Sequence, residues 1–158
     1  MELIGVRIEQ PANTPILLLR EAEGRQRLLP IYIGGPEAAA IAYALEGEVP
    51  PRPLTHDLFC TVLGELATQV ERVVITSFEV HTYFAELHLV TNGVTRVVSS
   101  RPSDAVALAV RLHAPIFASE AVLDEMGRDP EPAYGSDEII EEFRAFIEDV
   151  NPEDFGGS

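Results

Sequence analysis

Residues 87–109 read LHLVTNGVTRVVSSRPSDAVALA, a stretch in which a strand pattern gives way to a helix pattern. Asn92-Gly93 separates two runs rich in β-branched and apolar residues, and this dipeptide is a strong short-range signal for a β-hairpin. Pro102 then stops the second run, and the serine and aspartate that follow it favour the first turn of a helix. The stretch therefore predicts a hairpin that leads directly into a helix.

Strand and helix patterns continue on both sides of this stretch. Alternation, apolar runs and turn signals predict strands over residues 2–9, 15–19, 27–33, 70–80, 83–90 and 114–118. Helices are predicted from Pro36 to about Glu46, where Gly47 ends the run, after Thr55, from Pro102, and briefly around residues 122–123. We expect a single α+β domain, in which a mixed, largely antiparallel sheet carries the helices that begin at Pro36, Thr55 and Pro102.

Two of these helices have an apolar face. After Thr55, apolar residues recur at the spacing of one helical face, which predicts a helix that faces the core; they are Leu58, Phe59, Val62, Leu63, Leu66 and Ala67. In the helix that begins at Pro102, the same spacing predicts a buried side formed by Ala105, Val106, Leu108, Ala109 and Leu112. Both helices are therefore expected to pack against the sheet.

Acidic residues are concentrated at the C-terminal end. The net charge is −15, and residues 120–158 hold 13 acidic residues against two arginines, a net charge of −11. Residues 127–135 read as a linker, and Ser136 then precedes an amphipathic helix whose apolar stripe is Ile139, Ile140, Phe143, Phe146, Ile147 and Val150. We expect a domain over residues 1–126 and an acidic linker and helix over residues 127–158, with the stripe packed on its own domain, on a second subunit or on a protein partner.

Composition indicates a cytoplasmic globular protein. With 158 residues, of which 46% are hydrophobic, the chain is long enough to bury a core. Cys60 is the only cysteine, so an internal disulfide is excluded and a reducing compartment is the simpler assumption. No run approaches the roughly 18 apolar residues of a membrane span.

The side chains offer few candidates for chemistry. The sequence has no phosphate-binding glycine loop, no G-x-S-x-G elbow and no paired zinc ligands. The remaining candidates are Glu37, Arg52, His56, Asp57, Arg101 and Asp104. In the functional interpretation, Arg52 or Arg101 neutralises a phosphate near a helix N-terminus, while His56 or a carboxylate handles a proton or a metal.

A structural interpretation explains the same residues. Thr55 and Ser103 would cap the two helices, and Asp57 and Asp104 would stabilise their positive ends by roughly 0.3–1 kcal/mol each. The two arginines would then pair with these acids and pin the helices together. In the same way, His81, His88 and His113 read as surface or packing residues and Cys60 as a small core residue.

Several motifs, in this order along the chain, resemble the bifunctional nuclease domain family. They are LPIYIG at residues 29–34 with Glu37-Ala38, PRPLTHDL at 51–58, RPSDAVALA at 101–109 and API at 114–116. The resemblance covers about residues 6–123 and implies hydrolysis of phosphodiester bonds in DNA, RNA or both. The chain departs from the family at Ser99, where an aspartate is common.

Two functional hypotheses follow. In the first, the protein is a nuclease in which Arg52, Arg101 and Ser103 bind the phosphate, His56, Asp57 and Asp104 carry the chemistry, and Glu37, Asp57 and Asp104 hold a divalent cation such as magnesium or manganese. In the second, it is a non-catalytic oligomeric regulatory module, a dimer most simply, that binds a protein partner or a small anion. Because a net charge of −15 repels a polyanion, the nuclease hypothesis requires a local basic cluster or a bound cation.

Overall fold

The computed structural model describes residues 1–130, and every strand and helix predicted before residue 127 is present. The elements are β1 (Glu2–Glu9), β2 (Thr14–Arg20), β3 (Leu28–Tyr32), α1 (Gly35–Glu46), α2 (Thr55–Glu65), β4 (Thr68–Glu79), β5 (Thr82–Thr91), β6 (Val94–Ser100), α3 (Pro102–Leu112), β7 (Ile116–Ala118) and α4 (Glu120–Met126). The α+β class is therefore confirmed.

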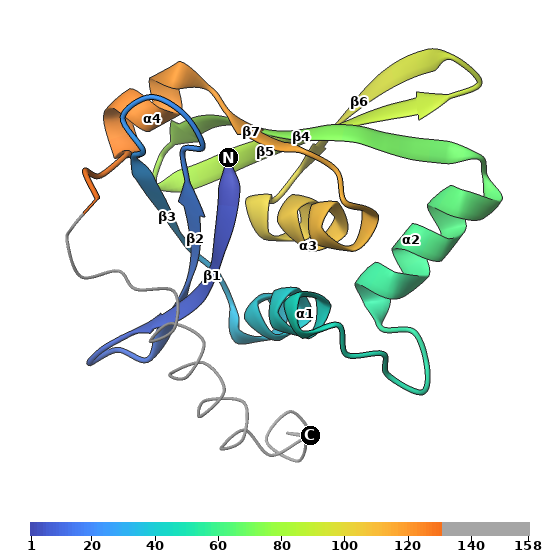
Figure 1. Cartoon of the computed structure of the whole chain (residues 1–158), viewed down its shortest axis with the longest axis horizontal. Coiled ribbons are helices and arrows are strands. Elements are labelled where there is room, and N and C mark those ends of the chain that lie inside the picture. The colour runs from blue at the N-terminus through green and yellow to red at the C-terminus, as the bar shows by residue number, and fades with distance from the viewer. Residues whose placement is uncertain (131–158) are drawn as a thin grey trace.

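The strands form two sheets rather than the single sheet expected. β1, β2 and β3 form an antiparallel sheet, and the second sheet has the order β6-β5-β4-β7, with only β7 parallel to its neighbour (Figure 1). Two hydrogen bonds join the sheets: the Tyr83 hydroxyl donates to the carbonyl of Pro30 at 3.1 Å, and the amino group of Met1 donates to the carbonyl of Ile116 at 2.6 Å. Spacing along the chain could not reveal this division, because pairing between distant strands is set by packing.

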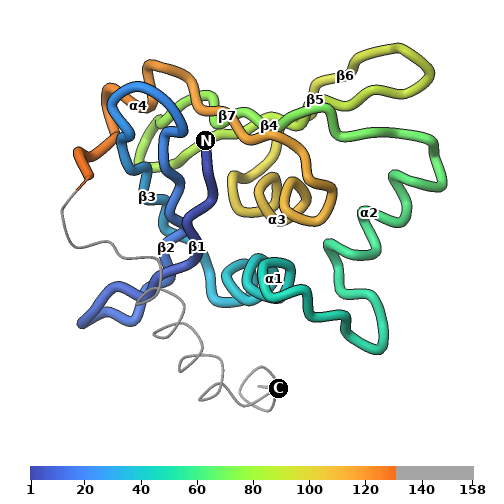
Figure 2. The backbone as a smooth tube through the Cα atoms, in the orientation of Figure 1, coloured from blue at the N-terminus to red at the C-terminus, as the bar shows by residue number. Residues whose placement is uncertain are grey.

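Helix α3 lies at the centre of the molecule. It packs on β4 and β5 with one side and on α1 with the other, as the tube in Figure 2 shows. Ala105, Ala107 and Ala109 are all buried, so α3 is covered on more than the one face that was predicted. Leu112 was expected on the buried side, but it lies in the last turn and is partly exposed.

Helix α2 does not face the core as predicted. Of its apolar face only Leu63 is buried, whereas Leu58 and Leu66 are 53% and 63% exposed and Phe59 and Val62 are about half exposed. The helix lies at one end of the molecule, where it contacts α3 and the start of β4 (Figure 1). Helical spacing identified an apolar stripe correctly, but it could not show that the rest of residues 1–130 leaves the stripe uncovered.

The C-terminal end of the described chain is tied to the body. The backbone groups of Arg128 and Leu28 exchange two hydrogen bonds of 2.8 Å. Most of the predicted linker and the whole predicted helix after Ser136 lie outside the described residues. Between residues 1 and 130, no helix has the length and hydropathy needed to cross a membrane.

Candidate functional site

The N-termini of α2 and α3 meet, so the two arginine-proline motifs, PRPLTHDL at residues 51–58 and RPSDA at residues 101–105, lie side by side. Nε2 of His56, from α2, lies 3.1 Å from Oδ1 of Asp104, from α3. Arg101 donates from Nε to Asp104 Oδ2 at 2.7 Å and from one terminal nitrogen to Glu37 Oε1, at the start of α1, at 3.1 Å. These four residues, Glu37, His56, Arg101 and Asp104, form the Arg101 cluster.

The start of α1 positions Glu37 for this contact. Gly34 is the N-cap and Pro36 lies in the first turn, so the negative charge of Glu37 faces the positive end of the helix. A methyl group added at Gly34 would overlap the Glu37 carboxylate, whereas one added at Gly35 would meet nothing within 4 Å. The absence of a side chain at Gly34 therefore lets the carboxylate fold back toward Arg101.

Gly34→Ala is expected to separate Glu37 from Arg101 while lowering the melting temperature by only a few degrees, since the flexible carboxylate can rotate away. The measurement is the ¹⁵N resonance of the Arg101 guanidinium, which should shift as it does in Glu37→Gln. Gly35→Ala is the matched control and should leave that resonance in place. An unshifted resonance in Gly34→Ala would show that the Glu37 contact does not persist in solution.

Hydrogen bonds within the Arg101 cluster shift the pKa values of Asp104 and Arg101. Burial by itself raises the pKa of the Asp104 carboxyl, but the hydrogen bonds from Arg101 and His56 outweigh it, so the pKa lies below its usual value. The hydrogen bond to Asp104 in turn raises the pKa of Arg101. Asp104 is therefore an anion and Arg101 a cation at neutral pH.

The contact with Asp104 fixes which nitrogen of His56 is free. An ionised carboxylate can only accept a hydrogen bond, so Nε2 of His56 carries the proton that Asp104 accepts. In neutral imidazole the other ring nitrogen, Nδ1, then holds the lone pair. His56 is thus oriented by a carboxylate with one nitrogen available to take a proton.

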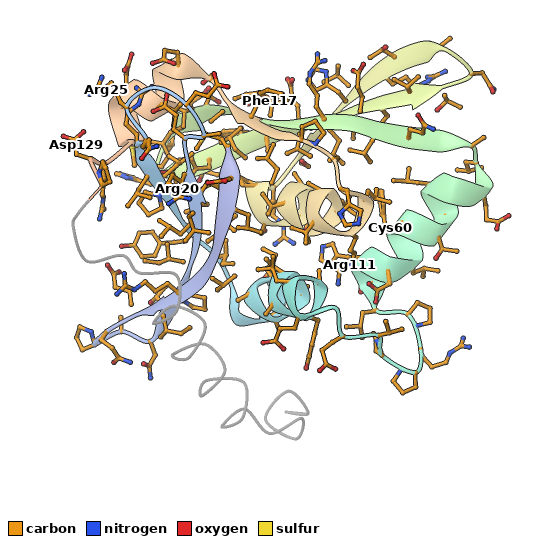
Figure 3. All side chains as sticks on the ribbon, in the orientation of Figure 1. Arg20, Arg25, Cys60, Arg111, Phe117 and Asp129 are labelled. Atoms are coloured by element: carbon orange, nitrogen blue, oxygen red, sulfur yellow. The ribbon has the colours of Figure 1, made fainter. Side chains whose placement is uncertain are left out.

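Asp57 belongs to a separate contact. It accepts a hydrogen bond from Nε of Arg111 at 2.6 Å and another from the backbone nitrogen of Leu54 at 2.9 Å. The hydrogen bond from Arg111 is the main reason that the pKa of Asp57 is lowered. Figure 3 labels Arg111 where α3 approaches α2. This pair joins α2 to α3, a role that the structural interpretation gave to Arg52 or Arg101. Arg101 does pair with Asp104, as that interpretation expected, but its second ion pair is with Glu37 of α1.

Three other predicted residues lack the contacts that were expected of them. Arg52 is exposed and makes no hydrogen bond or ion pair with any residue of the range 1–130. Thr55 and Ser103 do not cap their helices, whose N-caps are Leu54 and Arg101. The N-caps lie one residue before Thr55 and two residues before Ser103, because Asp57 satisfies the backbone of Leu54 and Pro102 takes the first position of α3.

The carboxylates as arranged do not fit the predicted cation site. Arg101 lies between Glu37 and Asp104, and Arg111 neutralises Asp57. Among the residues that the structure describes, no group of three His, Cys, Asp or Glu side chains is placed to hold a metal ion. Each carboxylate already has an arginine where a cation would bind.

A cavity of about 740 Å³ opens beside the cluster, a feature that sequence reasoning missed. Glu37, Arg101 and Ser103 form one side of it, and the β4–β5 turn, β3 and α4 supply the rest; the lining includes Tyr32, Phe78, His81, Thr82, Tyr83, Met126 and Arg128. His81 was predicted to be a surface or packing residue. Only the division into two sheets, which the sequence did not reveal, brings these segments together.

Comparison with known proteins places the chain in a family. The family model of the bifunctional nuclease domain matches residues 17–131. An uncharacterized protein of Mycobacterium tuberculosis is 44% identical over 163 residues, which cover 98% of this chain and 96% of that protein.

Two plant proteins are more distant relatives. Bifunctional nuclease 2 of Oryza sativa subsp. japonica is 29% identical over 82% of this chain, and Bifunctional nuclease 1 of Arabidopsis thaliana is 27% identical over 86% of it. The aligned regions cover only 41% and 45% of those longer proteins. Because the family model matches most of its length, this chain belongs to the bifunctional nuclease domain family, as its RPSDA and PRPLTHD motifs predicted.

Proposed function

We propose that the protein is a nuclease that hydrolyses phosphodiester bonds in DNA, RNA or both, and that the Arg101 cluster is its active site. The observation that carries the proposal is an exposed arginine beside a histidine that a carboxylate orients. The Arg101 side chain is 65% exposed, so its ion pairs contribute little to folding. An exposed cation held next to an oriented histidine is better explained by substrate binding than by stability.

Each residue of the cluster has a role in this proposal. Arg101 and the free backbone N–H groups at the start of α3 attract a phosphate and neutralise the charge that develops on its oxygens. His56 takes the proton of the attacking water at Nδ1 as the bond from phosphorus to the leaving oxygen breaks, and the leaving oxygen takes up a proton from solvent. Asp104 holds the ring and stabilises its charged form. Glu37 holds Arg101 in place.

The acidity of the whole chain is less of an obstacle than its net charge suggests. Residues 120–158 carry most of the charge imbalance, and the rest of the chain has a net charge of only −4. At the cluster, Asp104 and Glu37 are both paired with Arg101, and Asp57 is paired with Arg111. A phosphate that approaches Arg101 therefore meets acids held in ion pairs instead of free ones, and the sum of the charges of Glu37, Asp104 and Arg101 is only −1.

The proposal is tested by hydrolysis of single- and double-stranded DNA and RNA, with a chelator and with added magnesium or manganese. Asp104→Asn should lower the rate at least about tenfold, because the ring of His56 loses its anionic partner, with little change in melting temperature. Asp129→Asn, which removes the same charge at an exposed position, is the control. Equal cleavage by all three proteins would indicate a contaminating nuclease and contradict the proposal.

The exposed face of α2 favours the second hypothesis in part, since it suggests self-association. We propose that Leu58, Phe59 and Val62 pack against a second copy of the chain, because a contiguous apolar patch is a common mark of an interface. The C-terminal helix remains a proposed contact for a protein partner, and the cytoplasm remains the proposed location.

Val62→Glu is expected to convert a dimer into a monomer, since it places a charge in the apolar contact without disturbing a buried residue. Sedimentation velocity measures this directly. Val49→Glu, at a position that is 89% exposed in the loop before α2, should leave the dimer intact. A wild-type protein that sediments as a monomer at micromolar concentration would rule out this contact.

A further inference from the structure

We propose that the cavity beside the Arg101 cluster binds one nucleotide of a single-stranded nucleic acid, with its base against the aromatic residues of the β4–β5 turn and its phosphate at Arg101 and Ser103. The inference rests on the proposed nuclease function and deepens it, because it names the part of the substrate that the site recognises. It assigns a role to Phe78, His81, Tyr83 and Ser103.

The cavity has the size and lining of a small-molecule site. Its volume of about 740 Å³ lies within the ~300–1,000 Å³ that is usual for such sites. Most of its lining is aromatic or apolar. Of the polar lining residues, Glu37, Arg101 and Ser103 lie on the side that α1 and α3 form, and the others are His81, Thr82 and Arg128. A ligand that fits this division has a flat apolar part and an anionic part.

The aromatic side is a preformed stacking surface. The rings of Phe78 and Tyr83 lie 4.6 Å apart at 54°, and His81 meets Phe78 edge-on at 6.4 Å. The Tyr83 hydroxyl is held by the carbonyl of Pro30, and burial raises the pKa of Tyr83 to about 12, so it remains a neutral ring. Bases stack on such surfaces without regard to sequence.

The polar side contains a hydroxyl without a partner, on a residue that is otherwise buried. Ser103 is only 6% exposed and lines the cavity, yet its hydroxyl makes no hydrogen bond with any residue between 1 and 130. The Ser103 oxygen is not among the fully buried unpaired atoms of residues 1–130, so it is open to the cavity and can hydrogen-bond a ligand there. Ser103 lies in the first turn of α3, where free N–H groups and Arg101 attract an anion.

These two sides together favour a nucleotide over simpler ligands. An inorganic anion would use Arg101 and Ser103 but not the aromatic rings, and a neutral apolar ligand would leave the arginine unused. A nucleotide uses both, and its phosphate would lie at Arg101, which is linked to His56 through their shared partner Asp104. The proposed base pocket therefore adjoins the Arg101 cluster on the side of Glu37 and Arg101, which are its two members that line the cavity.

The test is binding, measured apart from hydrolysis. Adenosine 5′-monophosphate, adenosine and inorganic phosphate are titrated while the fluorescence of the four tyrosines is followed in a chain that has no tryptophan. The monophosphate should bind at least about tenfold more tightly than either fragment. A single-stranded hexa-adenylate RNA should compete for the same site; a failure to compete would show that the cavity takes free nucleotides only and would overturn the strand assignment.

Two variants separate the two sides of the cavity. Phe78→Leu should weaken binding of both the monophosphate and adenosine by about tenfold, which is typical of the loss of one stacking contact. Ser103→Ala should weaken the monophosphate several-fold and leave adenosine unchanged. Phe84→Leu, on β5 but outside the cavity lining, is the control.

The two proposals fail in different ways. Unchanged monophosphate affinity in Phe78→Leu, with a melting temperature like that of Phe84→Leu, would overturn the base-pocket assignment even if hydrolysis is observed. Normal nucleotide affinity in a protein that hydrolyses no substrate would support the pocket and contradict only the nuclease proposal.

Discussion

Arg27→Met is expected to lower the melting temperature by at least ~10 °C, because it removes a buried cation from among three carboxylates. Arg27 is only 4% exposed, and its guanidinium donates to Glu21 at 2.9 and 3.0 Å, to Glu120 at 2.6 Å and to Asp124 at 2.8 Å. Methionine is unbranched and reaches about as far as Nε of arginine, so the change removes the charge and keeps the packing of the apolar stem. Glu21, Glu120 and Asp124 would then repel one another where α4 meets the β2–β3 turn.

Thermal unfolding followed by circular dichroism measures this effect, with Arg25→Met as the matched control. Arg25 is a neighbouring arginine, but it is exposed and lies 4.0 Å from Asp124, so its loss should change the melting temperature by only a degree or two. The melting temperature of Arg27→Lys should lie between those of Arg27→Met and Arg25→Met, since one ammonium group cannot replace several guanidinium hydrogen bonds. A melting temperature for Arg27→Met equal to that of Arg25→Met would show that the ion pairs of Arg27 add nothing to stability.

The ion pairs of Arg27 also predict how the stability of the fold changes at acidic pH. The hydrogen bonds from Arg27 lower the pKa of Glu21 from its ordinary 4.5 to about 2. A depressed folded-state pKa means that the stabilisation is complete above about pH 4.5 and is lost as the pH falls toward 2. Within that window the stability of wild type should fall more steeply with pH than that of Glu21→Gln.

Local signals in the sequence were sufficient for the order of the elements. Asn92-Gly93 specified the β5–β6 hairpin, and Gly47 ended α1 in a left-handed conformation with φ of 68°, as a glycine at this position allows. Pro36 and Pro102 both lie in the first turn of a helix. These signals act over a few residues, so one sequence is enough to read them.

Features that depend on distant contacts could not be read in this way. The spacing of Leu58 and Val62 specified a helical stripe, but exposure depends on what lies beside α2 in space. Arg27 had no distinguishing neighbours in the sequence, because Glu120 and Asp124 reach it from far along the chain. The cavity was missed for the same reason.

The sequence motifs predicted part of the candidate site. Each arginine-proline motif begins a helix with an acid in the first turn, and the pairing of His56 with Asp104 follows from the meeting of those two helices. The motifs did not predict which arginine pairs with which acid. Asp57 turned toward Arg111 because neighbouring residues of a helix point in different directions, so His56 and Asp57 could not share a partner.

His56→Ala is expected to lower the rate of hydrolysis by about 10²–10⁴-fold, the usual contribution of a general base. His56 lies at the start of α2 and only one hydrogen bond of its side chain is lost, so the melting temperature should change by a few degrees at most. The substitution also leaves a space next to Asp104 of about the size of an imidazole ring. Added imidazole should therefore restore part of the rate in His56→Ala and none in a variant that lacks Arg101.

The double variant His56→Ala/Asp104→Asn makes the assignment of roles sharper. If Asp104 acts only by orienting His56, then its substitution should cost little once the histidine is gone, and the two effects should not add. Full additivity would mean that Asp104 contributes to the reaction independently of the ring. A rate in His56→Ala equal to that of wild type would remove the histidine from the chemistry and, with it, the main reason to regard the Arg101 cluster as an active site.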